Sequence, residues 1–130
     1  METEPIQLQA CRAYAKMMNT LDFSHLEPWL DDNLNYTSQW VFDEMNSKAA
    51  YSEYIRTKLE TIKTKGDRVL AEIGHTHAFS AGYCIILAQG EETNLHATLL
   101  ITMNESKIQK MAMCCVPSPY DCQRIGERPL

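Results

Sequence analysis

Two histidines separated by one residue, His75 and His77, are the most direct candidates for metal binding in this chain. On a β-strand, residues i and i+2 point to the same face, so both imidazoles would lie on one side. A zinc site needs three or four converging ligands, and only His96 or Cys84 on neighbouring strands could complete the set. No sequence spacing fixes that third ligand. The sequence therefore favours hydrogen-bonded histidines near a strand end and predicts no metal site.

The adjacent cysteines Cys114 and Cys115 raise the possibility of nucleophilic chemistry. In a strand they point to opposite faces, so they cannot easily act on one ligand together. Cys115 paired with His96 could supply a thiol nucleophile and its base. However, no helix N-terminus or basic cluster is apparent that would lower the pKa of the thiol. Buried structural cysteines are the favoured interpretation.

Acidic residues occur in two adjacent pairs, Asp31-Asp32 and Asp43-Glu44. Paired carboxylates are suited to general acid–base work. The first pair follows a short predicted helix, so a helix end and a turn are the simpler interpretation. The second pair could lie at the rim of a cavity, but we expect a solvated turn there. The chain also lacks a glycine-rich phosphate loop. No complete catalytic set is present, and no cofactor is predicted.

Length and composition predict a single domain over residues 1–116 and an irregular, proline-containing tail over residues 117–130. The formal charge of −5 argues against sequence-independent nucleic-acid binding. No apolar run is long enough for a membrane span, so no membrane association is expected. The acidic first residues do not have the pattern of a secretory signal, and the cysteine count of five is odd. We therefore expect reduced thiols and a cytoplasmic location.

Apolar periodicity predicts two long helices that would position these side chains. Ile6, Ala10, Tyr14, Met17 and Leu21 recur at helical spacing, which indicates a helix over residues 5–20. A second apolar stripe, bounded by a cap at Asn46-Ser47 and by Gly66, indicates a helix that ends near residue 65.

Between these helices the chain predicts a short helix and a strand. Ser24 and Glu27 have the spacing of a capping box, with Ser24 as the N-cap. Pro28 lacks an amide hydrogen, so this short helix should be distorted. Residues 35–42 then alternate as a strand, with Tyr36, Ser38, Trp40 and Phe42 on one face.

The second half of the chain has the period of two that is typical of strands. Four strands are predicted over residues 68–78, 81–89, 93–103 and 107–116, separated by turn signals. The links between them are short, which favours antiparallel pairing of neighbours.

The order of elements and several local patterns resemble the nuclear transport factor 2-like superfamily, which includes ketosteroid isomerases and polyketide cyclases. The matching features are Asp22 after the first helix, Leu26, Asp31-Asp32 before a strand, the helix start at Ser47-Lys48-Ala49, and a final hairpin over 103–108. The resemblance spans residues 6–116. It implies an α+β cone, also called cystatin-like, in which a curved mixed or antiparallel sheet wraps round the N-terminal helices.

Ketosteroid isomerases provide the clearest chemical comparison. They use a carboxylate base and an oxyanion hole built from a tyrosine and a protonated aspartic acid. In this sequence the tyrosine position corresponds to Tyr14, the base to Ser38 and the second acid to Leu99. A serine cannot act as the base at neutral pH without a partner, and a leucine donates no hydrogen bond. Isomerisation by that set is therefore disfavoured.

In the fold that the resemblance implies, one face of each strand lines a cavity. Strand parity and the first helix predict an apolar and aromatic lining of Tyr14, Met18, Tyr36, Ser38, Trp40, Phe42, Leu99, Met111 and Cys115. Such a lining is typical of small-molecule sites, although the same residues could simply fill the core.

Three functions remain open from the sequence. The first is a domain that binds a small apolar molecule and dimerises through the outer sheet face, as the resemblance implies, with Val41, Cys84, Ile86 and Cys114 as candidate interface residues. The second is a cyclase, isomerase or dehydratase in which Tyr14 acts with a histidine, Asp43 or Glu44. The third is a protein-interaction module that uses the sheet face.

Overall fold

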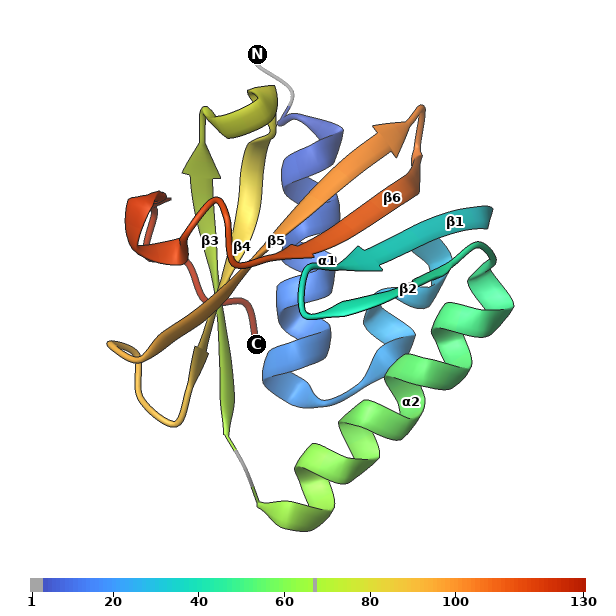
Figure 1. Ribbon diagram of the computed structural model, residues 1–130, viewed down its shortest axis with the longest axis horizontal. Helices are drawn as coiled ribbons and strands as arrows, with labels where there is room; N and C mark the ends of the chain where they lie inside the picture. The colour runs from blue at the N-terminus through green and yellow to red at the C-terminus, as the bar shows by residue number, and fades with distance from the viewer. Residues whose placement is uncertain (1–3, 67) are drawn as a thin grey trace.

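The computed structural model describes residues 4–66 and 68–130, without the side chains of residues 41–43. Two helices, α1 (Ile6–Thr20) and α2 (Lys48–Lys65), pack against a curved sheet of seven strands (Figure 1). None of the described helices is long and apolar enough to cross a membrane. The predicted α+β architecture is therefore confirmed.

Both long helices begin and end close to their predicted boundaries. α1 buries Ala10, Tyr14 and Met17, members of the apolar stripe seen in the sequence. The N-cap of α2 is Ser47, whose hydroxyl accepts a hydrogen bond from the Ala50 amide at 3.1 Å. The C-cap of α2 is Gly66, whose φ of +72° is the left-handed conformation that glycine adopts without strain.

The short helix predicted between them is two 3-10 turns, η1 (Phe23–His25) and η2 (Glu27–Trp29). The prediction of Ser24 as N-cap was wrong. The cap is Asp22, whose carboxylate accepts a hydrogen bond from the Ser24 amide at 3.0 Å. Pro28 lies in the second turn, where its missing amide hydrogen prevents a continuous helix.

The predicted strand over residues 35–42 is two strands in the structure, β1 (Leu30–Ser38) and β2 (Val41–Met45). β1 starts five residues early, so Asp31-Asp32 belongs to a strand rather than a helix end. Gln39 and Trp40 form the turn of an antiparallel hairpin. Trp40 therefore leaves the strand alternation, because its direction is set by a turn.

The remaining strands are β3 (Val69–Thr76), β4 (Gly82–Gln89), β5 (Leu95–Asn104), β6 (Lys107–Cys114) and the short β7 (Gln123–Arg124). The sheet order is β2-β1-β6-β5-β4-β3-β7. β3 to β6 pair as antiparallel neighbours, as the short links predicted, and a 3-10 turn, η3 (Ala78–Ser80), joins β3 to β4. β1 pairs with β6 in parallel, which makes the sheet mixed.

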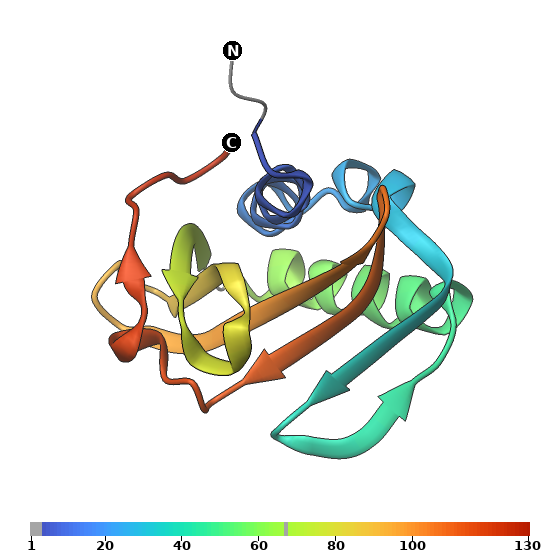
Figure 2. The ribbon, with the colours of Figure 1, turned by 90° about the horizontal axis from the view of Figure 1, so that it is seen from above.

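The main core lies between the helices and the inner face of the sheet. Figure 2 shows both helices on the concave side, with the strands bending round them. The inner face contributes side chains of one parity from each strand, including Leu34, Ile85 and Leu99, and all three are buried. This packing of helices into the curve creates the cone.

The C-terminal tail differs from the irregular segment that its composition predicts. After η4 (Pro119–Asp121) it adds β7 to the edge of β3, with Gln123 opposite His75. The Ile73 amide then donates to the carbonyl of Glu127 at 2.8 Å. The carboxamide of Asn19, on α1, donates to the carbonyl of Pro129 at 2.8 Å. Hydrogen bonds to the open edge of β3 therefore order the tail. The composition of the tail could not predict this pairing, because it depends on a distant strand.

The tail also covers part of the outer sheet face. Cys122 packs on Cys84 and Ile86 in a second, smaller apolar cluster. A Cβ on Gly74 would lie 2.5 Å from Cδ1 of Ile86 and 3.1 Å from the carbonyl oxygen of Gln123, so a side chain there has no space. Cys84 and Ile86, two of the candidate residues for the outer-face interface that the resemblance implies, are thus buried within the chain and are not free to contact a second copy.

Candidate functional site

A hollow that we call the inner cavity lies between the two helices and the concave face of the sheet. Its volume is about 310 Å³. Met18 of α1 and Ile62 of α2 face Leu87 and Met113 of the sheet across it. The other lining residues are Tyr36, Ser38, Trp40, Tyr54, Lys58, Val69, Ala88, Gln89 and His96. Residues that are distant in sequence thus build one apolar space.

The mouth of the inner cavity is marked by an aromatic stack. The rings of Trp40 and His96 are nearly parallel, with an interplanar angle of 9° and centroids 5.4 Å apart. Both side chains are exposed, and Trp40 retains 47% of its accessible surface. The Trp40 amide donates to the Ser38 hydroxyl at 3.3 Å, which fixes the hairpin turn. The turn therefore holds an aromatic ring beside the opening.

Tyr36 and Tyr54 line the cavity beneath this opening, and the buried Tyr51 packs against both of their rings. The ring of Tyr36 lies 5.2 Å from that of Tyr51 and 5.7 Å from that of Tyr54, centroid to centroid. Burial raises the pKa of Tyr36 and of Tyr51 well above the ordinary value of a phenol, so both stay neutral at physiological pH. The Tyr51 hydroxyl is buried and has no hydrogen-bond partner among the described residues. This part of the lining is therefore mainly aromatic, and the phenol of Tyr36 on it stays neutral.

The residues predicted for the cavity fall into two groups. Met18, Tyr36, Ser38 and Trp40 line it. Tyr14, Leu99 and Met111 instead lie in the packed core, each with 1% or less of its surface exposed. Strand parity assigns Leu99 and Met111 to the inner face, and Tyr14 projects from α1, but the packing of the helices against the sheet leaves no space beside these three side chains.

Two further predicted residues lie elsewhere. Cys115 is exposed and its backbone amide donates to the side-chain oxygen of Gln39 at 2.6 Å, away from the cavity lining. The side chain of Phe42 lies outside the described residues.

The contribution of α2 to the cavity lining was not predicted from the sequence. Tyr54, Lys58 and Ile62 recur every four residues and line the cavity from this helix. These three residues form a second helical stripe beside Tyr51, Ile55 and Leu59. Their spacing could have predicted that this second face of α2 also packs toward the sheet. His96 and Gln89, at the ends of strands, had no comparable signal.

The other chemical candidates do not assemble into sites. The ring of His75 lies 5.2 Å, centroid to centroid, from the rings of both His77 and Tyr83. No three metal-ligating side chains converge within the described part of the chain. Burial raises the pKa of the Cys114 thiol, which keeps it protonated and weakly nucleophilic. The Glu44 carboxylate accepts a hydrogen bond from Asn35 at 3.0 Å.

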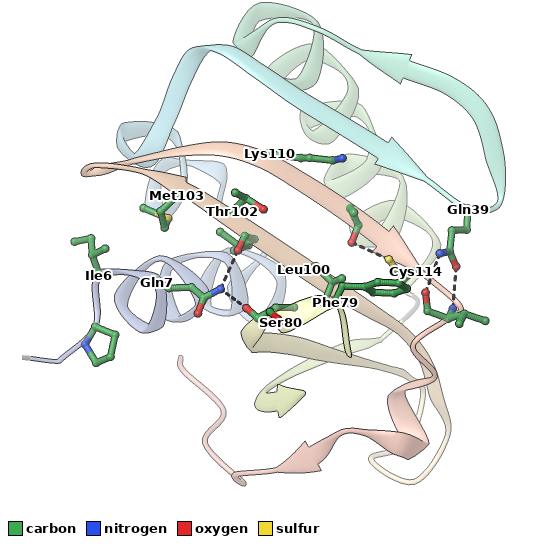
Figure 3. A pocket seen from close by; sticks show the side chains of 15 residues that line it. Ile6, Gln7, Gln39, Phe79, Ser80, Leu100, Thr102, Met103, Lys110 and Cys114 are labelled. Carbon is green, nitrogen blue, oxygen red and sulfur yellow. Dashed lines mark hydrogen bonds between the residues drawn. The ribbon is translucent and has the colours of Figure 1, made fainter. Parts of the chain in front are cut away.

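A second hollow, which we call the outer groove, lies on the opposite sheet face and has a volume of about 880 Å³ (Figure 3). Leu100, Ala112 and Cys114 form its floor, and Phe79 and Val116 flank it. Gln7 closes one end, where its side-chain amide donates to the carbonyls of Ala81 and Ile101 at 2.6 and 2.9 Å. The groove therefore has a mainly apolar floor and is bordered by the polar side chains of Gln7, Gln39 and Lys110.

No family model and no curated protein matches the chain. Solved structures of other proteins do match it. A SnoaL-like protein of unknown function from Burkholderia thailandensis has a TM-score of 0.65 at 13% identity, over 88% of this chain and 98% of that chain. An NTF2-like protein of unknown function from Cytophaga hutchinsonii has a TM-score of 0.61 at 12% identity, over 90% and 97%.

A protein of unknown function with a cystatin-like fold, from Methylobium petroleophilum, matches with a TM-score of 0.60 at 11% identity, over 84% of this chain and 74% of that chain. The chain has the nuclear transport factor 2-like fold. The resemblance seen in the sequence is thus confirmed at the level of the fold. Function must still be argued from the site, since one fold supports many functions.

Within this nuclear transport factor 2-like fold, the isomerase-type chemical set is incomplete. Ser38, to which the resemblance assigns the position of the carboxylate base, lies on the cavity wall. Leu99 and Tyr14 are in the core and do not line the cavity. The cavity is therefore suited to holding a molecule, and none of its described lining residues is a carboxylate.

Proposed function

We propose that the chain binds a small, largely apolar molecule in the inner cavity. The observation that carries this proposal is the space of about 310 Å³ with a buried apolar floor and an aromatic mouth. Ligand sites in proteins are concave, mostly apolar and equipped with few polar groups. The volume falls at the lower end of such sites, which favours a ligand of one or two rings or a short chain.

Binding is favoured over proton-transfer catalysis. A cyclase, isomerase or dehydratase of the type considered from sequence would need Tyr14 at the cavity, together with a base. Tyr14 is buried in the core, and burial raises its pKa. The carboxylate of Glu44 is hydrogen-bonded to Asn35 and does not line the space. A general acid–base pair must reach one substrate, and this pair does not share a cavity.

Filling the cavity should abolish binding. Ser38→Phe places a ring in the cavity, whereas Thr37→Phe places one on the neighbouring residue, which does not line it. With the neutral probe 2-naphthylmethanol in isothermal titration calorimetry, we expect Ser38→Phe to weaken binding at least about tenfold. Thr37→Phe should bind as the unmodified protein does. Equal loss in both variants, or no binding to the unmodified protein, would contradict the proposed function.

We also propose that two copies associate through the outer groove. Phe79 and Val116 flank it with 79% and 63% of their surfaces exposed, so a large apolar area faces solvent. Phe79 also has a left-handed φ of +54°, a costly conformation for a bulky residue. Strain of this kind is typical of functional surfaces. A two-fold symmetric dimer is the commonest way to cover such a face.

Static light scattering tests the dimer. We expect a dimer at tens of micromolar protein, and Phe79→Asp should weaken association by about tenfold or more because it places a charge in the buried interface. Leu130→Asp is the matched control, because Leu130 is 82% exposed and does not line the groove. A monomeric unmodified protein, or equal effects of both substitutions, would contradict the proposed dimer.

A further inference from the structure

The described side chains that line the inner cavity include a lysine but no carboxylate. Lys58 lines the cavity from α2 and forms no ion pair with any described carboxylate. Its ammonium lies 5.8 Å from the centroid of the Tyr54 ring, which also lines the cavity. A cation over an aromatic face is held by the ring quadrupole. Lys58 is therefore positioned beside the cavity without a neutralising partner there.

The remaining polar groups of the lining can all donate hydrogen bonds. They are Ser38, Gln89, His96, the indole of Trp40 and the phenols of Tyr36 and Tyr54. The described lining contains no aspartate or glutamate, although acidic residues outnumber basic ones in the chain by 17 to 12. A single cation among groups that can donate hydrogen bonds, with no carboxylate in the described lining, is complementary to an anionic oxygen.

Polar and apolar groups are also separated by depth. Gln89, His96 and Trp40 are exposed and Lys58 is half-buried, so these groups mark the solvent side. Tyr36, Leu87 and Met113 are buried and form the floor. A ligand that fits both regions has an apolar body and one charged end.

We propose that the ligand of the inner cavity is a small apolar monocarboxylate whose carboxylate pairs with Lys58 and whose body lies on the buried floor. This inference rests on the proposed function and specifies the chemical class of the ligand. Lysine binds an anionic group as a compact point charge and forms its strongest hydrogen bonds with ionised oxygens. The floor excludes water from the body of the ligand, and the charge at the mouth selects its headgroup.

Three probes with one ring system separate headgroup selection from cavity binding. They are 2-naphthoate, 2-naphthylmethanol and 2-naphthylmethylammonium, which at pH 7 are negative, neutral and positive. In calorimetric titrations of the full chain, we expect 2-naphthoate to bind about tenfold more tightly than the alcohol, and the ammonium compound to bind most weakly. An alcohol that binds as tightly as the carboxylate would overturn this inference and leave the proposed function standing. Failure of all three probes would overturn both.

The variant Lys58→Met removes the charge and retains an unbranched apolar side chain. It should bring the affinity for 2-naphthoate down to about that for 2-naphthylmethanol measured on the same variant, because the preference for the carboxylate depends on the charge of Lys58. Lys63→Met is the matched control, because Lys63 is an exposed lysine of the same helix that does not line the cavity. Equal effects of both variants would indicate general electrostatic attraction and would overturn the role of Lys58. Lys58→Arg should retain the preference for the carboxylate.

Discussion

Replacing Glu72 with alanine is expected to lower the free energy of unfolding by about 3 kcal/mol, because it removes a buried acid that pairs with both arginines of the tail. The Glu72 side chain is only 5% exposed. It accepts hydrogen bonds from Arg124 at 2.6 Å and from Arg128 at 3.2 Å. It also accepts one from the amide of Gly126 at 3.2 Å. The two arginine side chains are 38% and 33% exposed, so water compensates part of the loss.

Urea denaturation measures this loss, and Glu92→Ala is its matched control. Glu92 pairs with the same Arg128, at 3.4 Å, but its side chain is 61% exposed. Exposed ion pairs contribute little, so the control should change stability by less than about 1 kcal/mol. A loss in Glu72→Ala no larger than in Glu92→Ala would show that the buried carboxylate does not hold the tail.

Hydrogen exchange provides a local measurement of the same effect. The Ile73 amide donates to the carbonyl of Glu127 in the tail, so its protection depends on the tail staying on the edge of β3. In Glu72→Ala this amide should exchange faster than amides in the centre of the sheet, since the tail can open without global unfolding. Unchanged protection at Ile73 would contradict the proposed anchoring.

Replacing Leu99 with alanine is expected to lower the free energy of unfolding by about 3 kcal/mol through lost burial and a new void. Leu99 lies in the core with no exposed surface, opposite Ile85 on one neighbouring strand and Met113 on the other. Because Leu99 does not line the inner cavity, the affinity for 2-naphthylmethanol should stay within about twofold of that of the unmodified protein. Thermal or chemical unfolding and calorimetry measure the two quantities.

Ser38→Phe should show the opposite pattern, with binding lost and the loss of stability smaller than in Leu99→Ala. Ser38 is half-buried beside an open space, so an added ring has room that a packed core does not offer. If Leu99→Ala weakened binding as strongly as Ser38→Phe, the cavity would have to extend into the core. Together, the two variants separate the residues that fill the fold from those that line the site.

Local patterns in the sequence determined most of the elements. Helical spacing located α1 and α2, and the Ser47 cap and Gly66 stop fixed the limits of α2 because capping depends on adjacent residues. Alternation and turn signals located β3 to β6 for the same reason. The order of these elements was sufficient to indicate the nuclear transport factor 2-like fold.

Only the tertiary structure decided which inner-face residues line a cavity and which are packed. Strand parity gives the side to which a residue points, but the space beside it depends on the elements that pack against it. Leu99 and Ser38 both have inner-face parity, yet α1 covers the first and leaves the second beside a hollow. The ordered tail has a similar cause, since its partners Glu72 and Asn19 lie more than fifty residues away in sequence. The periodicity of a sequence depends on neighbours along one element. The cavity, the position of Lys58 beside it and the covered sheet edge depend instead on contacts between distant elements.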